Sequence, residues 1–358
     1  MPKFADRGSR SCLLLLLSLC FLAVPAHAGL TYVCDPNITN LGQGCNYLNS
    51  AIQSLYTSYF QDVNANIYIQ LGATALGGTT TVLNNVSYAG ANGYYAALNQ
   101  DKTSPADFSA VANLPANQSP GNLPANMRLT NANVRALPGL GITPTTGVMA
   151  DGATACTIGN AGCYDAVVTL SQTVNTDGEF WFRNGPQASD QYDFYAVVEH
   201  ETDEVLGTGS CAFDNQGNSP ASYCIGRFAP MDLFRYHSNG TLAWGTTGSN
   251  SACFLTSATN ACFSIDGTNM GIGFNNILNG ANTNDAGDYS TNCAFVQDAA
   301  GCMDIGQIDV LPSKELMALD VVGYTQVPEP AAFLTMGAGL AVLIARRRRR
   351  KADYRSAN

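Results

Sequence analysis

The segment 190–207 constrains the fold most, because it has the strongest helical pattern in the chain and carries charged residues near its end. Apolar residues recur at the spacing of one helix face, at Phe194, Val197, Val198 and Val205. Gly207 follows as the residue type that most readily adopts the left-handed conformation at a helix C-terminus. We therefore predict a partly buried helix that ends near Gly207 and packs its apolar face against the core.

The last two turns of this helix read HETDEVLG, from His200 to Gly207. His200 and Glu204 are four residues apart, so their side chains leave the same face one turn apart and can share one ion. Zinc accepts carboxylate oxygen as well as imidazole nitrogen. The pattern predicts His200 and Glu204 as metal ligands and Glu201 as the general base that takes a proton from a metal-activated water. The alternative is a helix surface with ordinary charged residues.

A catalytic zinc site takes a third protein ligand, and the sequence offers few candidates for it. Once the N-terminal leader is removed, His237 is the one histidine outside the helix. We predict His237 as the third ligand, and its alternative is a surface histidine in a hairpin. The other candidates are Asp232 and, behind it, Asp193 or Asp203.

The N-terminus has the composition of a secretory signal. Residues 1–28 contain three basic residues, then the apolar run CLLLLLSLCFLAV, and end in Ala26-His27-Ala28, a small-x-small cleavage site. We predict that 1–28 is a signal peptide and that the chain is exported. An N-terminal transmembrane anchor is the alternative, but the apolar run is short for a span and the cleavage site follows it directly.

The C-terminus contains three parts in order: Val-Pro-Glu-Pro at 327–330, the apolar segment AAFLTMGAGLAVLIA, and a basic cluster at 346–351. This arrangement resembles the PEP-CTERM sorting signal of Gram-negative bacteria, which a membrane-bound exosortase reads while a short helix and basic residues hold the substrate in the inner membrane. The resemblance implies that 325–358 is a sorting tail with a short transmembrane helix, that exosortase is a partner, and that the protein reaches the cell surface or extracellular matrix. A single-pass anchor with cytoplasmic arginines is the alternative.

The part between the two signals is strongly acidic. Of the 17 basic and 27 acidic residues, three basic and one acidic lie in 1–28, and seven basic and one acidic lie in 331–358. The remainder has 7 basic and 25 acidic residues, a net charge of −18. We therefore do not expect the protein to bind nucleic acid, because neutralising the phosphates needs clustered Lys and Arg, which this region lacks.

Ten of the 12 cysteines remain after the signal is removed, and they occur in close couples. An even number in an exported chain indicates disulfides rather than a cysteine zinc site, since no C-x-x-C pair occurs. The simplest pairing joins sequential neighbours: Cys34–Cys45, Cys156–Cys163, Cys211–Cys224, Cys253–Cys262 and Cys293–Cys302.

The remaining pattern predicts an α+β domain over 29–324 with disulfide-stapled loops. Helices are expected over 46–60, 105–114 and 313–324, and a strand over 65–72. Hairpins are expected around the turns 175–178 and 239–240, with a further one beginning at 262–267. Much of 72–145 is rich in Gly, Ala, Asn, Thr and Pro and is expected to be loop.

HExxExxG resembles the metzincin motif HExxHxxGxxH with glutamate at the second ligand position, and is similar to a group of exported bacterial metalloproteases. The group shares further segments that occur in this chain as DLFRY at 232–236, SIDG at 264–267 and LDxxGY at 319–324. The likeness implies a zincin-like fold, with an active-site helix under a mixed sheet and a cleft between them. Where metzincins have their third histidine, this chain has Ser210.

A second metal is a weaker hypothesis. Aspartates concentrate late in the domain and could include a structural Ca²⁺ site in an exported protein. The favoured interpretation is solvated acidic loops, because the spacing matches no calcium-binding repeat. The aspartates are Asp266, Asp285, Asp288, Asp298 and Asp304.

These patterns predict an exported Zn²⁺-dependent endopeptidase that hydrolyses a protein or peptide substrate with Glu201 as base. The alternative is a non-catalytic surface or matrix protein, adhesive or structural, with a vestigial metal motif. Loops rich in Gly, Asn and Thr, a low content of charged residues and five predicted disulfides fit that alternative equally well.

Overall fold

The computed structural model describes residues 29–39, 41–74, 76–121, 123–172, 179–211, 224–237, 240, 242, 261–269, 271–274, 287–289, 295–298 and 313–327. The chain divides into two compact units, 1–325 and 326–358. All helices and strands of the described residues belong to the first unit. The predicted signal peptide, 1–28, lies outside the described residues.

A four-stranded mixed sheet forms the centre of the first unit. Its order is β1 (Thr31–Cys34), β2 (Asn66–Gly72), β9 (Ala166–Ser171) and β3 (Gly77–Thr81). The first three strands are parallel, whereas β3 pairs antiparallel with β9 and forms one edge. Buried Ile and Val side chains of β2 and β9 supply the apolar surface that parallel strands need. The predicted mixed sheet and α+β class are confirmed.

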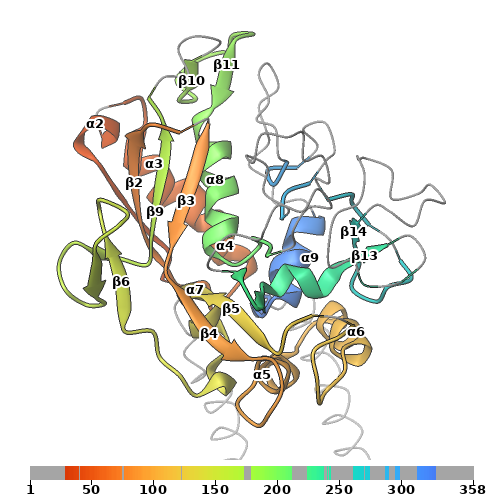
Figure 1. Ribbon diagram of the computed structural model, residues 1–358. Helices are drawn as coiled ribbons and strands as arrows, with labels where there is room; N and C mark the ends of the chain where they lie inside the picture. The colour runs from red at the N-terminus through yellow and green to blue at the C-terminus, as the bar shows by residue number, and fades with distance from the viewer. Residues whose placement is uncertain are drawn as a thin grey trace, which may run out of the picture. The chain divides into compact units, whose positions relative to one another are not determined.

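Helix α8 (Phe194–Val205) packs against β3 and β9 (Figure 1). Its apolar residues are buried as predicted, and they join one hydrophobic core with the sheet. The helical region predicted over 46–60 forms three consecutive pieces: α3 (Gly44–Tyr47), the π-helical turn η1 (Leu48–Ile52) and α4 (Gln53–Tyr59). Tyr56 in α4 is fully buried and donates a hydrogen bond to Asp203 of α8, 2.6 Å away.

A second sheet has the order β12 (Arg227–Phe228), β5 (Asn126–Thr130) and β4 (Leu83–Ser87). Helix α7 (Asn131–Ala136) contacts β4 and β5, and α6 (Pro105–Asn113) contacts both α5 (Tyr94–Asp101) and α9 (Ser313–Val321). Helix α6 begins as predicted: Ser104 accepts a hydrogen bond from the backbone N–H of Asp107, and Asp107 accepts one from that of Ser104.

The remaining elements are short. They are α2 (Pro36–Thr39), η2 (Pro138–Leu140), β6 (Thr146–Met149), β7 (Ala155–Thr157), β8 (Cys163–Tyr164), β10 (Glu179–Trp181), β11 (Gln191–Asp193), η5 (Pro230–Phe234), β13 (Arg235–His237) and β14 (Ala261–Phe263). Strand β13 pairs antiparallel with β14 and forms a bridge to Leu242, which confirms the predicted chain reversal near Gly240.

Two sequence expectations are wrong. Strands β9 and β10 do not form the predicted hairpin, because β9 pairs with β2 and β3 whereas β10 pairs in parallel with β11. The segment 72–145 is not mostly loop, since it contains β3, β4, β5 and three α-helices. Its strands are short and polar and pair with distant partners, so tertiary pairing outweighs their weak local propensity.

Three predicted disulfides are present: Cys34–Cys45, Cys156–Cys163 and Cys211–Cys224. The two cysteines of each pair are 7 to 13 residues apart, so each bond closes a short loop, as expected for surface staples. Cys262 is also disulfide-bonded, with Cys253 as its predicted partner outside the described residues. The predicted Cys293–Cys302 pair lies wholly outside them.

Four aspartates gather where the last helix meets α5 and α6. Asp62 accepts hydrogen bonds from the backbone N–H of Thr325, and Asp101 accepts one from the Thr325 hydroxyl. Asp320 is fully buried, and Ser104 donates to one of its oxygens. Burial raises the pKa of Asp320 to about 7, and the negative charges of Asp107 and its neighbours add to this effect.

We expect Asp320→Asn to stabilise the protein at pH 8. The unfolded carboxyl ionises near pH 4 but the folded one near pH 7, so the folded state binds more protons between these values. The free energy of unfolding of the wild type should therefore fall as the pH rises from about 4 to about 7. Asn keeps an acceptor for Ser104, and should raise that free energy at pH 8 by on the order of 1 kcal/mol.

Denaturant unfolding at pH 5 and pH 8 measures this difference. Asp190→Asn, at an exposed position, is the matched control and should change little at either pH. An equal effect of Asp320→Asn at both pH values would contradict the explanation.

Candidate metal centre

Helix α8 starts at Phe194, four residues later than predicted, because Asp193 caps it. The Asp193 carboxylate accepts hydrogen bonds from the backbone N–H groups of Tyr195 and Ala196. Arg183 forms an ion pair with the same carboxylate at 2.6 Å. The helix ends as predicted: Gly207 has φ +103°, and a Cβ there would collide with the Asn133 side chain. Cap and glycine together fix the length and rotation of the helix.

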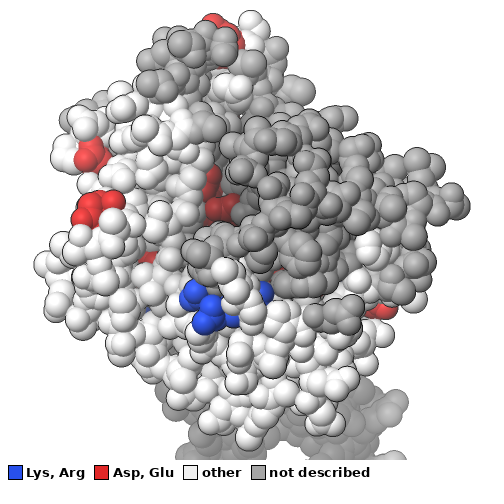
Figure 2. Space-filling view, viewed as in Figure 1, with Lys and Arg blue, Asp and Glu red and all other residues white. Residues whose placement is uncertain are grey.

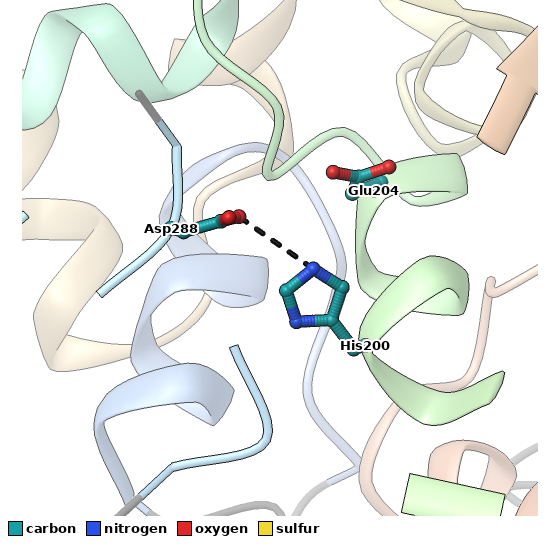
Figure 3. Close-up of side chains that lie close together, drawn as sticks. All are labelled: His200, Glu204 and Asp288. Atoms are coloured by element: carbon teal, nitrogen blue, oxygen red, sulfur yellow. Dashed lines mark ion pairs between the residues drawn. The ribbon is translucent and has the colours of Figure 1, made fainter. Parts of the chain in front are cut away.

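The structure brings His200 and Glu204 of this helix together with Asp288 (Figure 3). Potential ligand atoms of the three side chains lie within 4.8 Å of one another. His200 Nε2 is 3.6 Å from Asp288 Oδ1. His200 and Glu204 are partly exposed, whereas Asp288 is buried. The predicted pair from the helix therefore faces a carboxylate from a segment almost ninety residues further along the chain.

The orientation of His200 suits a metal ligand. Its Nδ1 lies 2.9 Å from the backbone carbonyl oxygen of Val296. A carbonyl only accepts, so Nδ1 carries the proton and Nε2 is the nitrogen that faces Asp288. Metal-binding histidines commonly use this arrangement, in which a hydrogen bond to one ring nitrogen fixes the other.

The position of Asp288 is also fixed by a hydrogen-bonded neighbour. Gln297 donates from its side chain to Asp288 Oδ1 at 3.2 Å, and its backbone N–H donates to Glu315 of α9 at 2.7 Å. Asp288 and Gln297 are buried, with exposed fractions of 5% and 1%. This chain of contacts connects α9 to the cluster and holds the carboxylate toward the helix.

The cluster has a strongly negative environment. Burial lowers the pKa of His200, but the charges of Asp288 and Glu201 outweigh it, and the pKa rises to about 9. Asp203 lies on the inner side of α8, where burial raises its pKa to about 7. Burial also raises the pKa of Glu315, and the charge of Asp203 adds to this. Such a site favours a cation.

Glu201 faces the edge strand. Thr79 of β3 donates a hydrogen bond to its Oε2, and the carboxylate is almost fully buried. A Cβ on Gly77 would collide with Glu201 Oε1, so only glycine leaves room for the carboxylate between α8 and β3. Glu201 is near enough to His200 to raise its pKa, but it is not one of the three clustered groups.

A pocket of about 450 Å³ lies beside Glu204. Glu204 lines it directly, and so does Thr79, the partner of Glu201. Its other described walls come from β3, β5, the turn after α8 and the start of η5. Figure 2 shows acidic side chains in a hollow on this face and a group of Lys and Arg side chains near them.

His237 is not a member of the cluster that the described residues form, in contrast to its predicted role as third ligand. It is the last residue of β13, and its Nδ1 is buried without a hydrogen-bond partner in the described part of the chain. The other candidates are used elsewhere. Asp232 accepts hydrogen bonds from Ser210 and the backbone of Ala229, and Asp193 caps α8. Asp203 binds Tyr56.

Asp288 is the member of the cluster that the sequence did not single out as a ligand of the helix pair. It is one of five aspartates in a region whose pattern favours solvated acidic loops. Sequence spacing gives no signal for it, because contact with α8 depends on how the chain returns past the helix. Its neighbours Phe295 and Tyr289 pack against each other, and aromatic residues so close to the aspartate are a hint that this segment is partly buried.

The other aspartates of that region give no calcium cluster among the described residues. Asp266 accepts hydrogen bonds from the backbone N–H groups of Thr268 and Asn269, which explains its position without a metal. Asp298 accepts one from the backbone of Phe295. Asp285 and Asp304 lie outside the described residues.

The donor set of the cluster fits a divalent metal. Ligands at about 2.0–2.2 Å in a tetrahedral zinc site are roughly 3.3–3.6 Å apart, close to the 3.6 Å between His200 Nε2 and Asp288 Oδ1. One imidazole and two carboxylates suit zinc, and the oxygen-rich set also suits Mn²⁺. Three protein ligands would leave a coordination position for water or substrate, as in catalytic zinc sites.

Residues 326–350 match the PEP-CTERM protein-sorting motif. The motif supports an exported protein of a Gram-negative bacterium that is recognised by exosortase and processed at the membrane, so the predicted sorting signal is confirmed. The chain matches no curated protein and no solved structure. None of the helices in the described part is long and apolar enough to cross a membrane, and the short helix predicted for the tail lies outside that part.

Proposed function

We propose that the protein is an exported zinc-dependent endopeptidase. The observation that carries this proposal is the convergence of His200, Glu204 and Asp288 beside a pocket, with a further carboxylate, Glu201, next to them on the helix. The sheet supports it as well, because α8 lies under a mixed sheet whose antiparallel edge strand borders the pocket. That is the arrangement implied by the zincin resemblance.

His200, Glu204 and Asp288 would hold the metal, which when bound supplies a water of lowered pKa and polarises the substrate carbonyl. Glu201 takes the proton from the attacking water and hands it to the leaving amine. Thr79 orients the Glu201 carboxylate, and the Val296 carbonyl orients His200. The charge of the two ligand carboxylates would balance that of a divalent ion, so that the ion and its three protein ligands together carry no net charge.

The sorting motif suggests where such an enzyme acts. We place the mature protein at the cell surface or in the extracellular matrix, after exosortase has processed the tail. The disulfides are suited to an oxidising extracellular environment.

Metal analysis of the full chain, purified after export, tests the proposal. We expect about one zinc per chain, cleavage of an unfolded protein substrate, loss of cleavage with a zinc chelator, and recovery when zinc is added back. A chain that binds no divalent metal and cleaves nothing would favour the non-catalytic surface or matrix protein instead.

A further inference from the structure

The pocket beside Glu204 has an uneven charge distribution. Of the described residues that line it, Arg128 is the one cation and Glu204 the one acid. The rest are uncharged, and several carry hydroxyl groups, including Thr79, Thr80 and Ser210. If Glu204 is committed to a metal, Arg128 is the one other charged side chain among the described residues that line the pocket.

Strand β5 directs Arg128 toward this pocket. Met127 and Leu129 are fully buried on one face of the strand, so Arg128 and Thr130 share the opposite face, and both line the pocket. The Arg128 Nη1 also donates to the backbone carbonyl of Leu83 on β4, at 3.5 Å. The guanidinium is therefore attached to a paired strand rather than a loop, which limits its movement.

A cation at this position is unusual for so acidic a domain. The region 29–330 has only seven basic residues. Two of them, Arg135 and Arg183, form ion pairs with Asp165 and Asp193, and Arg235 is fully buried. A carboxylate ligand would be repelled by most of the domain surface, so a local arginine is needed to admit one.

We propose that this pocket is a specificity subsite that binds a carboxylate of the substrate, through Arg128. This inference rests on the proposed peptidase function and names its substrate class: peptides with Asp or Glu next to the scissile bond, or with a free C-terminal carboxylate there. Both have the planar carboxylate that the guanidinium fork binds best. The volume of about 450 Å³ is ample for an acidic side chain and falls in the usual range of ligand pockets.

Paired peptides test the subsite in the full chain. The substrates are quenched fluorescent peptides that differ only in having Glu or Gln at a single position. When that position is next to the cleaved bond, we expect kcat/KM to be about 10–100-fold higher for the Glu peptide than for the Gln peptide. Arg128→Gln should abolish this preference, and Arg128→Lys should keep part of it. A peptide series with free or amidated C-termini distinguishes the two sources of the carboxylate.

Arg227→Gln is the matched control. Arg227 pairs in register with Asn126, two residues before Arg128, so it lies on the same sheet but is not among the residues that line the pocket. This variant should keep the preference. Thermal unfolding of each variant shows whether a loss comes from misfolding, and Arg128→Lys keeps the test interpretable if Arg128→Gln does not fold.

Calorimetric titration of the Glu201→Gln chain with the same peptides separates the subsite from catalysis. Tighter binding of the Glu or free-carboxylate peptide, lost with Arg128→Gln, supports the subsite even if no peptide is cleaved. If the Glu and Gln peptides, and likewise the peptides with free and amidated C-termini, are bound and cleaved equally well, the proposed carboxylate subsite is wrong. Failure of the wild type to bind metal or cleave any peptide would instead remove the proposed peptidase.

Discussion

Replacing Glu201 with Gln is expected to reduce peptide cleavage by about 10²–10⁴-fold without loss of the metal. Gln keeps the size of the side chain and an oxygen that can accept from Thr79, so the contact between α8 and β3 survives. It cannot take a proton from water, and a general base contributes an effect of this size. The measurement is kcat on an unfolded protein substrate together with metal content per chain.

Glu199→Gln is the control on the same helix. Glu199 is fully buried two residues earlier, outside the clustered ligands, and its exchange should leave cleavage and metal content unchanged. Full activity of Glu201→Gln would refute the assignment of the base. Loss of both metal and activity would show that Glu201 is a ligand rather than a base.

Replacing Asp288 with Ala is expected to lower zinc affinity by at least about 100-fold, because loss of groups that only support a ligand already costs 10–100-fold. His237→Ala should leave the affinity unchanged, since His237 is not among the clustered groups. Alanine is chosen for Asp288 because the oxygen of Asn could still coordinate. Titration with zinc in competition with a chromogenic chelator measures both affinities.

The two variants decide whether the third ligand is His237, as the sequence predicts, or Asp288, as the tertiary structure indicates. If His237→Ala loses zinc while Asp288→Ala retains it, the sequence prediction holds and the cluster is an ion pair. Circular dichroism of Asp288→Ala checks that the fold is kept, and Gln297→Ala, which removes the hydrogen bond to Asp288, should give a smaller loss of affinity.

Local signals in the sequence are sufficient for several elements. The apolar stripe and Gly207 predict α8, and the helix expected over 105–114 corresponds to α6. Close cysteine couples predict the three disulfides of the described residues, because short loops bring their ends together without help from the rest of the fold. The sorting tail is also predictable, since exosortase recognises a linear motif.

Long-range pairing is not predictable in this way. The threonine- and glycine-rich strand β3 has little intrinsic preference for a strand, and it forms because β9 offers it a partner. The failed hairpin between β9 and β10 has the same origin: β9 is drawn into the centre of the sheet between β2 and β3.

By itself, the sequence determined that His200 and Glu204 leave one face of a helix one turn apart, because helical geometry depends only on residues close in the chain. It also determined that Glu201 lies on the adjacent face. Only the tertiary structure decided which group stands opposite this pair. Asp288 is held there through Gln297 and Glu315, and Arg128 reaches the neighbouring pocket through β5. Asp288 and Arg128 both lie far from the helix in the chain, so no local spacing could encode their positions beside it.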